Sequence, residues 1–326
     1  MKLRTNLHLK KTNRRKFIKY ASLGSVVTSL LPIVPAAGSS IGKNTRRSLR
    51  IAHITDVHIL DQRNAEESFA RVIADINALP DRPDLIINTG DTVMDENKQT
   101  KETVSARWTA WSKQTQPNKI KMYSSLGNHD VWNGPNETLD TAYRKEKRYG
   151  KQWAMEMLSM PERFYSFESK GWHFIALDSI NGNDGYGLDD VQFEWLQGEL
   201  KRIDSNRPIC VFNHVPIMSI GAMLYLTQRT PIADVKFPTG DMHLDHQRIK
   251  NLFFKHKNVK LCLSGHVHYI DSIEYLGVKY LCNGAVSGNW WRDSFVLDEF
   301  PPVYSIIDLY EDGSSDCQTV YYKYQV

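Results

Sequence analysis

Gly127-Asn128-His129-Asp130 follows the apolar run from Ile120 to Leu126. A strand that ends at a glycine and then presents an amide, an imidazole and a carboxylate is poorly explained by packing, since these groups have little to bury. Four residues alone make a weak motif, because a turn with a solvated histidine has the same composition. Other clusters along the chain must decide between a turn and a functional site.

Short β-rich runs alternate with helical patterns from Leu49 onward, which is typical of a layered α/β domain. Two hairpins, one about Lys170-Gly171 and one about Gly277, do not fit a simple doubly wound sheet and predict a second, partly antiparallel sheet. The expected fold is a four-layer α/β/β/α sandwich of two mixed sheets, in one domain over 49–326. The predicted strands span 49–55, 85–88, 120–126, 164–169, 172–177, 208–213, 259–264, 269–275, 278–282, 303–309 and 319–324, and the predicted helices span 65–79, 103–113, 138–148, 190–203 and 246–255.

Polar clusters also follow four other predicted strands. Each cluster alone could be a helix cap or a turn. Because the carboxyl ends of strands in an α/β sheet meet at one edge, we expect all five clusters to converge on one crevice. These four clusters are Asp56-Val57-His58, Gly90-Asp91, Asn213-His214-Val215-Pro216 and Gly265-His266-Val267-His268.

The motif order resembles that of the calcineurin-like metallophosphoesterase superfamily, over about residues 49–285. By this resemblance, Asp91 bridges two metal ions, and the substrate is a small-molecule phosphate monoester or diester. Met94 stands where purple acid phosphatases have a tyrosine, and the spacing is closer to cyclic-nucleotide phosphodiesterase-like members. The resemblance assigns one metal to Asp56, His58, Asp91 and His268, and the second to Asp91, Asn128, His214 and His266.

The residue types support a transition-metal site. Oxygen ligands combined with imidazole suit iron, manganese or zinc as divalent or trivalent ions, whereas an all-oxygen set favours magnesium or calcium. Two carboxylates leave a positive surplus on two such ions, which attracts phosphate. We expect a hydroxide between the ions to attack phosphorus, with His129 as the general acid that protonates the leaving oxygen. Asp130 is the expected partner that orients His129, with Asp95 as the alternative.

Substrate selection is expected from irregular segments near the crevice, over 181–187, 219–246 and 284–293. Adjacent tryptophans followed by an arginine could stack on a base or sugar and pair with a phosphate. The equally weighted alternative is that the two indoles pack at the sheet edge. The predicted substrate contacts are Asn128, Trp290, Trp291 and Arg292.

The first 50 residues carry twelve Lys or Arg and no acidic residue, which leaves 29 basic and 37 acidic side chains in the remainder. Arg14-Arg15 precedes a mildly apolar stretch and Pro35-Ala36-Ala37, which resembles a twin-arginine export signal. A nucleic-acid-binding arm would not explain that stretch. We expect a leader over 1–37, a linker over 38–48, export by the twin-arginine translocation machinery, and a periplasmic or extracellular protein.

The formal charge and the hydropathy of the chain argue against two classes of partner, nucleic acids and membranes. Loss of the leader changes the formal charge from +4 to about −4, so no nucleic acid is expected. The leader's apolar stretch is too short to span a bilayer, and no stable membrane insertion is expected. A catalytically idle binding protein with the same fold is the alternative function, and a nuclease is a weaker one.

Overall fold

The computed structural model describes residues 45–323 except 136–142, 182–184, 223–239 and 293–299. The chain divides into Met1–Asn44 and Thr45–Val326, and all described residues belong to the second unit. The predicted leader lies outside the described residues. Among those described, no helix is both long and apolar enough to cross a membrane.

One mixed sheet has five strands, in the order β11-β10-β1-β2-β3. Strands β1, β2 and β3 run parallel, so their carboxyl ends lie at one edge, while β10 pairs antiparallel with β1. The five strands are β1 (Arg47–Ile54), β2 (Leu85–Asn88), β3 (Lys121–Ser124), β10 (Val303–Tyr310) and β11 (Ser315–Tyr321).

The second mixed sheet has six strands, in the order β4-β5-β6-β7-β9-β8. Its outer pairs β4–β5 and β8–β9 are the two predicted hairpins, and β5, β6, β7 and β9 run parallel. The six strands are β4 (Tyr165–Ser169), β5 (Trp172–Ala176), β6 (Ile209–Phe212), β7 (Val259–Ser264), β8 (Ile270–Tyr275) and β9 (Val278–Asn283).

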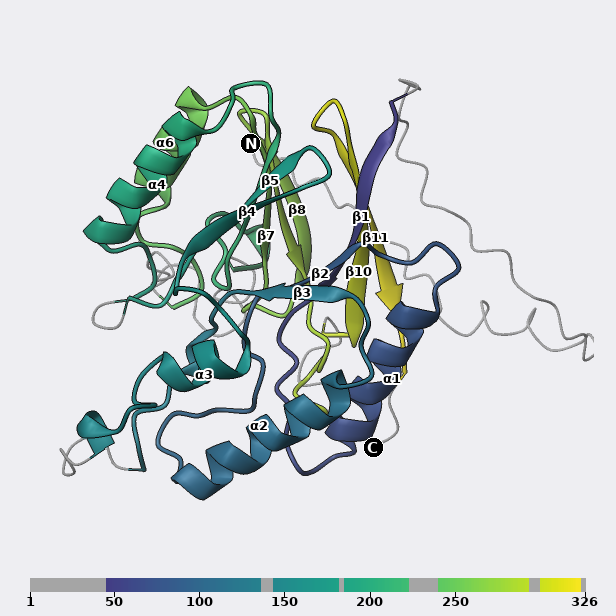
Figure 1. Ribbon diagram of the computed structural model, residues 1–326, viewed down its shortest axis with the longest axis vertical. Helices are drawn as coiled ribbons and strands as arrows, with labels where there is room; N and C mark the ends of the chain where they lie inside the picture. The colour runs from purple at the N-terminus through teal and green to yellow at the C-terminus, as the bar shows by residue number, and fades with distance from the viewer. Residues whose placement is uncertain (1–44, 136–142, 182–184, 223–239, 293–299, 324–326) are drawn as a thin grey trace, which may run out of the picture. The chain divides into compact units, whose positions relative to one another are not determined.

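The helices cover the outer faces of the two sheets, with α1 and α2 on one side and α4 and α6 on the other (Figure 1). Alternation along β5 shows why: Phe174 packs in the core that includes both sheets, whereas Ile175 packs with residues of α4 and α6. The predicted four-layer sandwich is confirmed. The helices are α1 (Ala65–Ala78), α2 (Lys101–Thr115), α3 (Gln152–Met157), α4 (Asp190–Arg202) and α6 (His246–Lys255), with short 3₁₀ turns η3 (Asn128–Asp130) and η4 (Tyr143–Lys145).

Three local predictions differ from the structure. The last strand, predicted over 319–324, spans Ser315–Tyr321. The helix predicted over 138–148 is only the 3₁₀ turn η4 within its described part, where Glu146 N–H donates to the Tyr143 carbonyl three residues back. Helix α3 was not predicted, because six residues are too few to show a helical period. Its burial of Trp153 against the core stabilises it instead.

Candidate metal centre

The five polar clusters converge as predicted from the strand ends. The loops after β1 and β2 are joined by backbone hydrogen bonds, from Asp56 N–H to the Gly90 carbonyl at 3.0 Å and from His58 N–H to the Asp91 carbonyl at 2.9 Å. The carboxylate of Asp91 lies between two groups of side chains and also forms a third close set with His58 and His129. Its Oδ2 is 3.6 Å from His58 Nε2 and 3.2 Å from His214 Nε2.

The first group combines Asp56, His58 and His268, all buried. The Nε2 atoms of His58 and His268 are 3.2 Å apart, and His268 Nε2 is 3.2 Å from Asp56 Oδ1. Asp56 Oδ1 has no hydrogen-bond partner among the described residues. A buried carboxylate oxygen that faces imidazole nitrogens without a hydrogen bond fits a metal ligand.

The second group combines Asp91, His214 and His266, with Asn128 beside it. His214 Nε2 is 3.1 Å from Asn128 Oδ1 and 3.2 Å from His266 Nδ1. Every side chain that the resemblance assigns to a metal therefore lies in one of two adjoining groups, with Asp91 near both.

Backbone carbonyls determine which ring nitrogens face the two groups. His268 Nδ1 is 2.8 Å from the Gly288 carbonyl, His214 Nδ1 is 2.9 Å from the Thr89 carbonyl, and His266 Nε2 is 2.7 Å from the Gly240 carbonyl. A carbonyl only accepts, so each of these nitrogens carries the proton and the other nitrogen of a neutral ring presents a lone pair. Lone pairs that face each other across about 3 Å fit a bound cation.

The charges of the site agree with that arrangement. Burial lowers the pKa of His58 to about 3 and that of His266 to about 4, so both rings are neutral at pH 7 and able to bind metal. Burial would raise the pKa of Asp91, but the facing imidazoles, above all His214, keep it well below its usual range. The centre therefore combines neutral imidazoles at His58 and His266 with ionised carboxylates, whereas at His214 burial is outweighed by the facing carboxylates, above all Asp91, which raise the pKa to about 9.

Five of the seven predicted ligands adopt left-handed backbone conformations. For a residue with a side chain this conformation is uncommon, and strain of this kind concentrates at functional sites. Each of these residues lies just beyond the end of a strand, in the loops that meet at the centre. Their φ angles are 51° for Asp56, 45° for His58, 49° for Asp91, 71° for His266 and 59° for His268.

Two motif glycines are needed for close approach rather than for a left-handed turn. Gly127 was expected to make the turn, but its φ of −99° and ψ of 170° are extended. A Cβ at Gly127 would overlap Asp91, and a Cβ at Gly265 would overlap Thr55 and Asp56. The absence of side chains at these positions lets loops from different strands meet at the centre.

His129 lies at the rim of the centre, with a quarter of its side chain exposed. Its Nε2 is 3.8 Å from Asp91 Oδ2, and its Nδ1 is 3.6 Å from Asp95 Oδ1. The prediction that Asp130 orients this ring is wrong, because the buried Asp130 carboxylate accepts from the backbone N–H groups of Gly127 and Thr92 at 3.0 and 2.8 Å. Asp95, the alternative partner, is the carboxylate beside Nδ1.

Comparison with known proteins agrees with this geometry. Residues 49–269 match the family model described as calcineurin-like phosphoesterase. The chain belongs to the calcineurin-like phosphoesterase family. Members of this family are phosphoester hydrolases that bind a dinuclear metal centre, and the chain carries the corresponding cluster of metal-binding side chains.

Individual relatives of this phosphoesterase are distant but cover most of its length. A 3',5'-cyclic-nucleotide phosphodiesterase of Nostoc sp. is 25% identical over 83% of this chain and 91% of its own. A probable glycerophosphodiester phosphodiesterase of Arcobacter nitrofigilis is 23% identical over 82% of this chain and 83% of its own. A dimetal phosphatase from Danio rerio shares the fold, with a TM-score of 0.60 at 12% identity over 85% of this chain and 100% of that one.

The predicted substrate contacts of the phosphoesterase separate in the structure. Trp290 lines the cavity of about 170 Å³ at the centre, together with Asn128 and His129. Trp291 is fully buried, and its indole N–H donates to the Val57 carbonyl at 2.9 Å, so the prediction that it contacts substrate is wrong. Arg292 is exposed and is not among the described residues that line this cavity.

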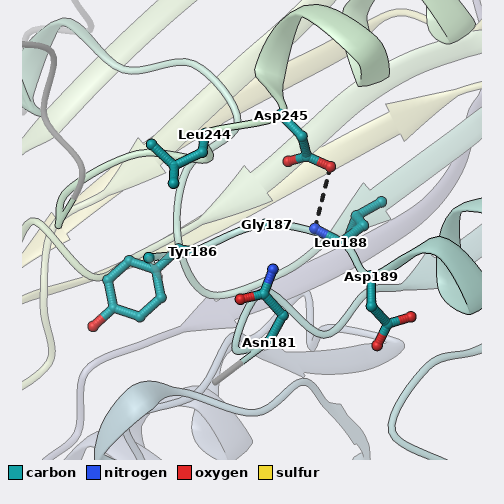
Figure 2. Close-up of a pocket in the computed structure, with 8 residues that line it drawn as sticks. Asn181, Tyr186, Gly187, Leu188, Asp189, Leu244 and Asp245 are labelled. Carbon is teal, nitrogen blue, oxygen red and sulfur yellow. Dashed lines mark hydrogen bonds between the residues drawn. The ribbon is translucent and has the colours of Figure 1, made fainter. Parts of the chain in front are cut away.

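Residues from loops between the motifs also surround the centre. Gly240 and Asp241 line the central cavity, and the ring of Tyr186 packs edge-on against His266, with centroids 5.0 Å apart. Tyr186 and Leu244 also line a neighbouring cavity of about 280 Å³, shown in Figure 2. The sequence placed these residues in long irregular segments, but no motif singled them out.

Proposed function

We propose that this phosphoesterase is an exported phosphodiesterase with a dinuclear transition-metal centre of iron, manganese or zinc. The observation that carries the reaction class is the pair of adjoining ligand groups with Asp91 near both, each with imidazole lone pairs aimed inward. The names of the two sequence relatives support diesters over monoesters as substrates. The substrates in these names, a cyclic nucleotide and a glycerophosphodiester, are both small-molecule diesters.

In this proposal the predicted ligand sets hold the two ions, which activate water and the phosphate group when bound. Asn128 orients a phosphate oxygen, because its amide lies beside His214 and lines the cavity. His129 lines the same cavity, and in this proposal its Nε2 donates its proton to the leaving oxygen. Asp95 Oδ1 lies 3.6 Å from Nδ1, which makes no hydrogen bond among the described residues, and would favour Nε2 as the donor once the two atoms approach.

The reaction is tested with a matched pair of aryl substrates, bis(p-nitrophenyl) phosphate as the diester and p-nitrophenyl phosphate as the monoester. Each is offered to the mature protein with manganese, iron or zinc added separately. We expect kcat/KM for the diester to exceed that for the monoester with at least one metal. A monoester preference would overturn the diester assignment, and no turnover with any metal would favour a binding protein.

Export is proposed from the leader alone, because residues 1–44 lie outside the described residues. The doublet Arg14-Arg15 and the small residues up to Ala37 support recognition by the twin-arginine machinery. Replacement of both arginines by lysine keeps the charge and should retain the precursor in the cytoplasm. Periplasmic protein at the unaltered level after this change would contradict the proposal.

A further inference from the structure

The segment from Val286 to Trp291 lies against the loop that carries Asp56 and His58. Val286 N–H donates to the Thr55 carbonyl at 2.9 Å, and Ser287 N–H donates to the Asp56 carbonyl at 3.1 Å. The indole N–H of Trp291 lies 2.9 Å from the Val57 carbonyl and 3.2 Å from that of His58. The segment therefore contacts four consecutive carbonyls of the ligand-bearing loop.

The same segment also contacts His268, from the opposite sheet. The Gly288 carbonyl accepts from His268 Nδ1 at 2.8 Å, which directs Nε2 toward Asp56. The ring of Trp290 stacks on that of His268, with centroids 4.3 Å apart and 30° between the planes. The segment thus contacts the loop that carries Asp56 and His58 and also the ring of His268, which together make up the first ligand group.

The backbone of this segment is itself strained. Trp290 and Trp291 have φ angles of 51° and 60°, and two consecutive bulky residues in the left-handed region require strong support from their surroundings. Part of that support is Arg63, whose Nη1 donates to the Trp290 carbonyl at 2.9 Å. At the other end, Val303 N–H donates to the Ala285 carbonyl at 2.9 Å. Hydrogen bonds near both ends of the segment therefore hold its strained backbone in place.

The second ligand group has different supports. His214 is held by the Thr89 carbonyl and His266 by the Gly240 carbonyl. Among the contacts described for these two rings, none comes from residues 286–291. The rings of the second group are therefore held by other carbonyls, while Asp56 Oδ2 accepts from His266 N–H at 2.9 Å and joins the two groups.

We propose that residues 286–291 form a clamp that sets the metal affinity of the Asp56–His58–His268 site selectively. Trp291 and Arg63 are positioning residues in this proposal, because they act through the backbone of the ligand loop and of Trp290. The clamp lies beyond residue 269, where the match to the family model ends. The inference rests on the proposed assignment of the metal ligands.

The test isolates each site before the clamp is altered. His214→Ala leaves only the first site intact, and His268→Ala leaves only the second. Trp291→Phe is then introduced into each background, which removes the indole N–H but retains an aromatic ring. Metal-free protein is titrated with Mn²⁺ by calorimetry. We expect about 10- to 100-fold weaker binding in the His214→Ala background and less than a twofold change in the His268→Ala background.

Trp172→Phe is the matched control, since Trp172 is also buried and its indole N–H donates to a backbone carbonyl, that of Tyr310, at 3.0 Å. Trp172→Phe should leave the Mn²⁺ affinity of both sites unchanged. If Trp291→Phe does not fold as judged by circular dichroism, Arg63→Met replaces it, because that change removes the bond to the Trp290 carbonyl, together with one positive charge. Arg63→Met should weaken the first site in the same direction.

The outcomes separate failure of the clamp from failure of the ligand assignment. Equal weakening in both backgrounds, or no weakening in either, would overturn the selective clamp. Binding of two Mn²⁺ ions by His214→Ala or His268→Ala would instead overturn the proposed ligands. Loss of turnover without a change in single-site affinity would also contradict the clamp, because its effect must appear in metal binding.

Discussion

Some side chains near the centre hydrogen-bond to the backbone, whereas others lie beside the residues that line the cavity. Asp130 is fully buried and bonds backbone N–H groups, so it stabilises the 3₁₀ turn that carries Asn128 and His129. Asp95 is partly exposed and lies beside the ring of His129. Two carboxylates close in sequence to the motif residues thus have distinct roles that their residue type does not reveal.

Substitution of His129 separates proton donation from metal binding. His129→Ala should lower kcat on the aryl diester by about 10²- to 10⁴-fold, because a positioned general acid contributes that much. Metal content, measured by elemental analysis, should remain that of the unaltered protein. Asp95→Asn should lower kcat by less, since the imidazole remains. Loss of bound metal in His129→Ala would show that the ring is a ligand.

Gly265→Ala tests the close approach of the strand-end loops. A methyl group at this position would overlap Thr55 and the Asp56 carboxylate, so we expect loss of metal binding and destabilisation by about 1–3 kcal/mol. Gly277→Ala is a comparison outside the centre, because a Cβ there has open space despite the φ of 84°. Urea unfolding and metal content should be affected at Gly265, while metal content should be unaffected at Gly277.

At the scale of elements, carboxylates tie the start of α6 to the chain before α4. Asp245 accepts from Leu188 N–H at 3.2 Å and contacts His243 Nδ1 at 3.1 Å (Figure 2 shows the first bond). His243 in turn lies 3.0 Å from Ser179 Oγ and is buried. The histidine is therefore part of a structural network.

The stability contribution of Asp245 should depend on pH. Burial would raise the pKa of this carboxyl, but His243, Leu188 N–H and Arg248 lower it below its usual value. A lowered folded pKa stabilises the protein above the unfolded pKa of about 4, and this stabilisation is lost as pH falls further. Asp245→Asn should therefore cost about 1–3 kcal/mol at pH 7, with the difference shrinking below about pH 4.

Asp190→Asn is the matched control for this experiment. Asp190 also contacts Arg248, at 2.8 Å, but its side chain is 90% exposed. An exposed ion pair contributes little, so the change should cost about 0.5 kcal/mol or less at any pH. The measurement is the free energy of unfolding in urea across pH 3–8. A pH-independent cost for Asp245→Asn would contradict a role for its charge.

For the molecule as a whole, the metal centre connects the two sheets. Asp56, His58 and Asp91 follow strands of the first sheet, whereas His214 and His268 follow strands of the second. Ions bound between them would link these loops in the folded state only. Metal binding and global stability are therefore expected to be coupled.

Metal removal should accordingly lower the melting temperature. With free metal at 100 to 1,000 times Kd, each bound ion should stabilise the fold by about 2.7–4.1 kcal/mol. Calorimetric scans before and after chelation, and after restoring Mn²⁺, measure this change. His268→Ala should show a smaller shift than the unaltered protein. Identical melting temperatures with and without metal would contradict the coupling.

Sequence patterns were sufficient for the layers and for the position of the centre. Short apolar runs identified β2 and β7, and helical spacing identified α6, at their observed bounds, because these apolar residues are buried in the core. The motif spacing also placed all seven predicted ligands together. Periodicity failed where the element was short, as in α3, or where local 3₁₀ bonds replaced a helix, as in η4.

Tertiary structure alone decided what each side chain near Gly127-Asn128-His129-Asp130 contacts. The sequence by itself determined that an amide, an imidazole and a carboxylate follow β3, because their order is covalent. That Asp130 bonds the backbone, that Asp95 faces His129 and that Trp291 contacts the Asp56 loop depend on distances between segments far apart in the chain. Such contacts arise only when loops from several strands are packed at one edge, which no local pattern encodes.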